Sequence, residues 1–112
     1  MYSKELLKGT LTTIILKLLL HNGKMYGYEI TQRVKILSDD KIMIKEGSLY
    51  PALHKLKDDG LVKTDEEMIG NRVRKYYSLT EKGKLSTEEK VNELHQFIGT
   101  LQNILTDKPS MA

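Results

Sequence analysis

Residues 46–62 constrain the fold of this 112-residue chain more than any other segment. Leu49, Leu53 and Leu56 recur at i, i+4 and i+7, which places them in a single apolar stripe on a helix. Gly60 follows the last turn of that helix, and the chain continues directly into apolar residues that suit a strand. The segment therefore predicts a short helix that stops on a glycine and feeds into a strand.

The side of this helix turned away from the stripe carries small and hydrogen-bonding groups, where an ordinary surface helix would have long charged ones. They are Gly47, Pro51, His54 and Asp58, flanked by Ser48, Tyr50, Lys55 and Lys57. Such groups let the start of a helix press closely against a flat polar partner. Further along, a turn at residues 70–71 leads into the cationic strand 71–79. A docking helix followed by a basic β-hairpin is the layout of a winged helix, which indicates DNA binding.

Four segments of the chain resemble the PadR family of transcriptional regulators. They are 26–30 (YGYEI), 46–56 (EGSLYPALHKL), 60–62 (GLV) and 74–83 (RKYYSLTEKG), in the family's order and spacing. The resemblance implies an α+β, mostly helical winged helix-turn-helix with a C-terminal dimerisation helix, as in the short members that have one such helix. Residues 1–79 are then the winged helix-turn-helix DNA-binding domain, and residues 80–112 are the C-terminal dimerisation helix and tail.

The resemblance also implies a function. We expect a sequence-specific regulator of transcription, a repressor that binds a pseudo-palindromic promoter site on double-stranded DNA as a homodimer. A small hydrophobic or phenolic effector is expected to release it. Two other interpretations stay open: a winged-helix protein of plasmid or phage replication or partition, and a protein-interaction winged helix. The latter predicts an apolar or acidic face on the docking helix, where the sequence has Ser48, His54 and Lys55.

Ten residues are expected to face DNA. They are Tyr26, Ser48, Tyr50, Pro51, His54, Lys55, Asn71, Arg72, Arg74 and Lys75. Hydroxyl, imidazole and ammonium groups on the docking helix can bond phosphates or base edges in the major groove. Arginines at a hairpin tip suit a narrow minor groove, where the negative potential is enhanced. The structural alternatives are a solvated helix face and, for the wing, pairing of its cations with Asp65, Glu66 and Glu67.

The remaining elements follow from periodicity and end signals. Helices are predicted over residues 4–21, 26–37 and 81–106, with Thr80 capping the last, and a short extended piece over 41–45. The second helix is predicted to bury Ile30, Val34 and Leu37. The docking helix is predicted to begin near Gly47. If Ser48 caps it, Pro51 lies in the first turn, where its missing N–H costs nothing, whereas a start at Glu46 costs the helix one backbone hydrogen bond at Pro51. The wing strands are predicted over 61–68 and 71–79.

The last helix carries a second apolar pattern. Val91, Leu94, Ile98, Leu101 and Leu105 are spaced 3, 4, 3 and 4, which makes an a/d heptad seam. Either this helix folds back on its own core, or the seam pairs with a second copy, joined by Leu7 and Leu11 of the partner's first helix. An effector pocket would then lie near the seam, lined by Leu94, His95, Phe97 and Ile98 as well as Leu7 and Leu11.

Composition narrows the class. The net charge is only +3, but residues 1–79 carry 14 Lys and Arg against 10 Asp and Glu, whereas residues 80–112 carry 4 against 5. This places the positive charge on the part expected to meet phosphates. No cysteine, signal peptide or membrane-length apolar run is present, which predicts a cytoplasmic protein. The three histidines share no ligand spacing, and no catalytic motif occurs, so we expect no metal, no cofactor and no enzymatic activity.

Overall fold

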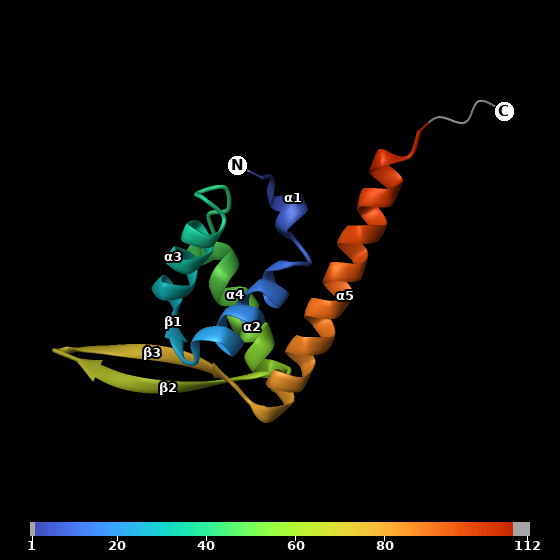
Figure 1. Cartoon of the computed structure of the whole chain (residues 1–112). Coiled ribbons are helices and arrows are strands. Elements are labelled where there is room, and N and C mark those ends of the chain that lie inside the picture. The colour runs from blue at the N-terminus through green and yellow to red at the C-terminus, as the bar shows by residue number, and fades with distance from the viewer. Residues whose placement is uncertain (1, 109–112) are drawn as a thin grey trace.

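The computed structural model describes residues 2–108, whose helices and strands are drawn in Figure 1. In chain order the elements are α1 (Lys4–Leu7), α2 (Leu11–Asn22), β1 (Met25–Tyr26), α3 (Gly27–Leu37), α4 (Glu46–Asp58), β2 (Val62–Ile69), β3 (Arg72–Leu79) and α5 (Glu81–Thr106). Helices thus dominate, with one small antiparallel sheet. The predicted α+β winged helix with a C-terminal helix is confirmed.

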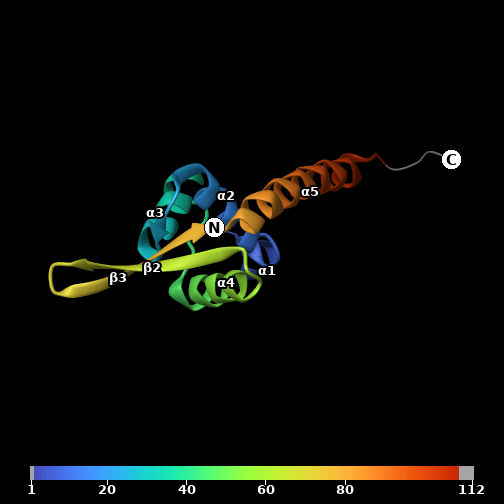
Figure 2. The ribbon, with the colours of Figure 1, turned by 90° about the horizontal axis from the view of Figure 1, so that it is seen from below.

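The sheet forms the wing and its base. Its order is β1-β3-β2, and β2 pairs with β3 over their full length, from Val62↔Leu79 to Ile69↔Arg72. β1 reaches only Tyr76 and Tyr77, so residues 72–75 of β3 have a free edge on that side. Beyond this base the hairpin projects away from the helices, on the side of the molecule opposite to α5 (Figure 2). The strand limits agree with the predicted ones within about one residue, the usual boundary uncertainty.

The core lies around α2, which contacts α3, α4, α5 and β3. Its fourteen buried hydrophobic residues are Ile15, Leu16, Leu18, Leu19, Met25, Ile30, Val34, Leu49, Leu53, Leu56, Leu61, Val62, Tyr77 and Leu79. The predicted stripe of α4 is therefore confirmed. Leu37 was expected in this core and is instead 62% exposed, because it is the last residue of α3 and no other element within residues 2–108 buries it.

The predicted first helix over 4–21 is wrong, because the chain breaks at residues 8–10. Gly9 has φ +92, a left-handed conformation that glycine adopts without a Cβ penalty. Lys8 is extended, and the Thr10 hydroxyl donates a hydrogen bond to the Leu7 carbonyl, 2.9 Å away. Leu7 consequently belongs to a separate one-turn helix, while Leu11 opens α2. The two residues do not share one helical face.

Two helix starts lie one residue from the predicted positions. α3 begins at Gly27 and not at Tyr26, because Met25 and Tyr26 pair with β3 as a strand that the sequence did not reveal. α4 begins at Glu46 after Lys45, so Ser48 is not the cap and Pro51 lies inside the helix. Residues 41–45 are irregular and form no strand.

The start of α5 is fastened to the end of α4. Thr80 caps α5 as predicted, accepting a hydrogen bond from the Gly83 N–H at 3.0 Å, and its hydroxyl donates to the Gly60 carbonyl at 2.7 Å. The Lys82 ammonium donates to the Asp59 carbonyl at 3.1 Å. From there α5 runs past α2 and leaves the body of the molecule, so that residues 95–108 are exposed (Figure 1). The first half of α5 packs on the core, whereas its second half does not fold back on it.

Candidate nucleic-acid interface

The polar side of α4 is open to solvent. Tyr50 is 44% exposed, Pro51, His54 and Lys55 are also exposed, and Ser48 is half-buried. His54 Nε2 lies 3.3 Å from Asp58 Oδ2, and Lys55 Nζ lies 3.2 Å from Asp59 Oδ2. Contacts this exposed contribute little to stability, so His54 and Lys55 can exchange these carboxylates for DNA phosphates.

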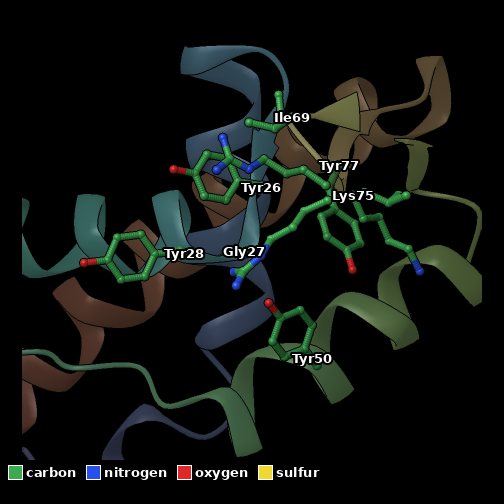
Figure 3. Close-up of a pocket in the computed structure, with 10 residues that line it drawn as sticks. Tyr26, Gly27, Tyr28, Tyr50, Ile69, Lys75 and Tyr77 are labelled. Carbon is green, nitrogen blue, oxygen red and sulfur yellow. The ribbon is translucent and has the colours of Figure 1, made fainter. Parts of the chain in front are cut away.

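A cleft of about 340 Å³ separates α4 from the free edge of the wing (Figure 3). We call it the wing cleft. Its lining residues are Tyr26, Gly27, Tyr28, Tyr50, Ile69, Arg72, Val73, Arg74, Lys75 and Tyr77. Tyr50 rises from α4 on one wall, and Tyr77 lies across from it on β3. Three cations and four phenols gathered at one opening suit an anion such as a backbone phosphate.

Gly27 is the reason that Tyr50 can enter this cleft. A Cβ placed on Gly27 would lie 2.5 Å from the Tyr50 hydroxyl oxygen and 3.0 Å from its ring carbon Cζ. The missing side chain therefore leaves room for a phenol from α4 against the start of α3. Burial raises the pKa of Tyr77, and the nearby Tyr50 adds to that effect, so the Tyr77 hydroxyl stays protonated as a donor.

Tyr26 is placed differently from the other expected contacts, since its ring is half-buried against the wing. The Arg74 guanidinium carbon lies 4.0 Å from the centroid of the Tyr26 ring. The Tyr76 ring meets it edge-on, with centroids 5.6 Å apart at 82°. Nearby, Lys24 Nζ lies 5.0 Å from the centroid of the Tyr76 ring, and Lys24 forms an ion pair with Glu67. This hydrogen bond to Glu67 raises the pKa of Lys24.

The expected cross-strand pairing of the wing cations is absent from residues 2–108. Arg74 lies opposite Glu67 and Lys75 opposite Glu66 in the ladder, yet Arg72, Arg74 and Lys75 form no ion pair within the described part of the chain. Glu67 pairs with Lys24 instead. Asn71, Arg72 and Lys75 are exposed at and near the tip.

Sequence reasoning missed Lys24 and Gly27 as parts of this region. Both depend on β1, which brings residues 24–27 beside the wing. A two-residue strand has too little alternation to be recognised from a pattern. The Tyr-Gly-Tyr segment was the available signal, because a glycine between two aromatic residues suggests a close approach by another element.

A second hollow, of about 490 Å³ and almost wholly apolar, lies between α2, the end of α3 and α5; we call it the α5 groove. Its lining residues are Thr13, Ile14, Lys17, Leu18, Val34, Leu37, Ser38, Ile42, Val91, Leu94, His95 and Ile98. Leu94, His95 and Ile98 were expected to line a pocket and do line this one. Phe97 points elsewhere and is 54% exposed, and neither Leu7 nor Leu11 lines the groove.

Two kinds of feature are missing from the described residues. Among the helices of residues 2–108, none combines the length and the apolar character that crossing a membrane requires. Over the same residues, His, Asp and Glu side chains form no group of three that could hold a metal ion.

A helix-turn-helix with an open polar face and a cationic wing defines a winged-helix DNA-binding regulator of transcription. Residues 15–89 match the "Transcriptional regulator PadR-like family", and the chain belongs to that family. Members are transcriptional regulators and not enzymes.

Individual relatives agree with this assignment. A transcriptional regulator from Clostridium thermocellum has a similar structure, with a TM-score of 0.82 at 31% identity, over 96% of this chain and 100% of that one. The negative transcriptional regulator PadR of Bacillus subtilis is 32% identical over 81 residues, which are 71% of this chain and 41% of that protein. The structure of B. subtilis PadR in complex with operator DNA gives a TM-score of 0.66 at 31% identity, over 73% of this chain and 47% of that one. The present chain thus spans less than half of the B. subtilis regulator.

Proposed function

We propose that this chain is a repressor that binds a pseudo-palindromic operator as a homodimer. The observation that carries the proposal is the continuity of one surface, on which the wing cleft joins the open face of α4 to the cations of β3. The negative regulator of B. subtilis, whose structure was solved with operator DNA, supports the same mode of action.

In this proposal α4 enters the major groove with Ser48, Tyr50, Pro51, His54 and Lys55 toward the bases and phosphates. The wing, which carries Asn71, Arg72, Arg74 and Lys75, lies on the flanking backbone or minor groove, and Tyr26 supports it from behind. A two-fold dimer then reads two half-sites about 34–36 Å apart, one helical turn of DNA. Bound protein blocks polymerase at the promoter.

The exposed half of α5 supports a homodimer. Ile98 is 51% exposed and Leu105 is 80% exposed, and Leu101 lies on the same seam. Ile98 also borders the α5 groove, yet all three side chains remain exposed within residues 2–108. An apolar seam left in water is a typical protein-binding surface. Val91 and Leu94 at the base of the seam pack partly against α2, so a partner helix would extend an apolar contact that already exists. Leu7 and Leu11 of the partner are proposed to join it.

The α5 groove supports an effector of small hydrophobic or phenolic type. Its walls are almost entirely carbon, and His95 and Ser38 at its edges offer polar contacts. A compound that fits there can change the angle of α5 and, with it, the distance between the two α4 helices of the dimer. It can relieve repression only to the extent that it binds the misaligned state more tightly.

Titration of a labelled duplex from the chain's own promoter tests the DNA proposal. We expect binding of one dimer, at least about 1000-fold tighter than to a scrambled duplex at physiological salt. Equal affinity for both duplexes, or none at low salt, would overturn it. For the effector, we expect a member of a panel of phenolics and flat cationic drugs to raise the melting temperature and release the operator. If no compound does either, control by an effector is ruled out for that chemistry.

A further inference from the structure

Tyr26 lies where β1, α3 and β3 meet, and its ring is in contact with the wing on two sides. It sits directly opposite Tyr76 in the β1–β3 ladder, and the two rings pack edge to face at 5.6 Å. Arg74 lies two residues before Tyr76 on β3, and its guanidinium carbon is 4.0 Å from the centroid of the Tyr26 ring. A guanidinium over the face of a phenol ring at this distance is a cation–π contact.

The contacts continue to the second wing strand. Lys24 reaches over the Tyr76 ring at 5.0 Å and forms an ion pair with Glu67 of β2. Glu67 is in turn the residue opposite Arg74 in the β2–β3 ladder. Five side chains thus connect both wing strands to the start of α3, and we call them the wing brace: Lys24, Tyr26, Glu67, Arg74 and Tyr76.

The hairpin needs such a connection because little else holds it. β1 pairs with only two residues of β3, both at the base of the wing. Beyond that point Met68 and Val73 are exposed on one face, so no helix within residues 2–108 covers that face of the distal half. An isolated two-stranded hairpin is marginally stable in water. The angle of the wing relative to α4 therefore depends on a few contacts at its base.

We infer that Tyr26 and Arg74 are positioning residues that fix the wing relative to α4, while Arg72 and Lys75 provide the wing's charge to DNA phosphates. The Arg74 guanidinium makes a cation–π contact with Tyr26, whereas Arg72 and Lys75 have no ion pair or cation–π contact among residues 2–108. The inference rests on the proposed docking of the wing on DNA. Without the wing brace, the wing has to become ordered when it binds DNA. The inference therefore predicts a weaker affinity with no loss of a phosphate contact.

The first test uses the free protein. The chain has no cysteine, so Asn71→Cys at the wing tip gives a single attachment site for a spin label. We expect the label to move more freely in the Tyr26→Leu background, and Tyr26→Phe, which keeps the ring, to restore the original mobility. Arg74→Ser should act like Tyr26→Leu, whereas the matched variant Lys75→Ser on the same strand should leave mobility unchanged. Arg74 is only half-buried, so its variant keeps the test available if Tyr26→Leu fails to fold.

The second test measures operator binding against salt concentration. Tyr26→Leu and Arg74→Ser should each weaken binding about threefold to tenfold, the range expected for losing one such contact, with the salt slope unchanged. Their combination should be no weaker than either alone, because both remove the same contact. Lys75→Ser should lower the salt slope by about one unit. Combined with Tyr26→Leu, it should weaken operator binding by the product of the two separate factors.

Two results would overturn the inference. One is unchanged label mobility in both Tyr26→Leu and Arg74→Ser. The other is a salt slope about one unit lower in Arg74→Ser, together with an affinity loss in the double variant that equals the product of the two single losses. That result would make Arg74 a direct phosphate contact. If the unmodified protein binds no duplex, the proposed function fails, while the mobility measurement still decides whether the brace exists.

Discussion

At Gly83 the backbone of α5 comes so close to the start of the wing that no side chain fits between them. A Cβ there would lie 2.0 Å from the Leu61 carbonyl oxygen and 2.9 Å from its carbonyl carbon. Gly83→Ala must push α5 away from the strand, and overpacking of this kind costs about 3 kcal/mol of unfolding free energy. Urea denaturation at fixed protein concentration measures it as a lower midpoint with an unchanged slope.

Gly99 offers the matched control on the same helix. A Cβ on it would meet nothing within 4 Å, and it is turned away from the seam. Gly99→Ala should therefore raise stability by about 0.5–1 kcal/mol through helix propensity. Equal effects of the two substitutions would mean that the close contact at Leu61 does not determine the position of α5.

Single residues of the interface should also separate affinity from specificity. Arg72→Ala and Lys75→Ala remove cations without aromatic contacts, so each should weaken binding to every sequence and lower the salt slope by about one unit. Tyr50→Ala removes a group proposed to face base edges, and it should lower discrimination between operator and random duplex by about 1–3 kcal/mol. Anisotropy titrations at several salt concentrations measure both quantities. If Tyr50→Ala weakens both duplexes equally, Tyr50 contacts only the backbone.

At the scale of elements, α4 combines a well-buried stripe with an imperfect hydrogen-bond ladder. Pro51 is its sixth residue, so the Gly47 carbonyl lacks the N–H that residue 51 would otherwise donate. Pro51→Ala restores that bond, partly offset by a more flexible unfolded chain, and should stabilise the protein by about 1–2 kcal/mol. Urea denaturation checks this, with operator affinity measured in parallel. A destabilised variant would show that the helix depends on the proline ring.

The whole molecule is elongated, 69 × 30 × 20 Å, because α5 and the wing leave the body in opposite directions. For α5 the proposed consequence is that its seam belongs to a dimer. Leu101→Asp buries a carboxylate in that seam and should raise the dimer dissociation constant at least about 100-fold. Operator binding should be lost along with the dimer. Sedimentation velocity and duplex titration measure the two effects. Asn103→Asp adds the same charge on the outward side of the helix and should leave the dimer intact. A dimeric Leu101→Asp variant would place the interface elsewhere.

Much of the architecture could be predicted from local sequence. The stripe of α4, its stop at Gly60, the two wing strands, the Thr80 cap and the full length of α5 were all predicted within about two residues, the usual boundary uncertainty. Each depends on periodicity or on a terminal residue whose partners lie within one or two turns. These signals come from residues that are close together in the sequence, so a sequence pattern is sufficient to detect them. The family resemblance added the order of the elements.

Other features depend on residues far apart in the chain, and only the tertiary structure decided them. Periodicity ran through Gly9 without interruption, although the chain turns there. β1 exists because β3 offers it an edge, since two residues form no strand alone. That pairing brings Lys24 and Tyr26 beside Glu67 and Arg74, so an arginine expected on DNA stacks on a tyrosine. The sequence by itself determined most of the helices and the two wing strands, because the free energy that favours them is local. Which side chains meet was decided by packing, because those contacts exist only after distant segments have come together.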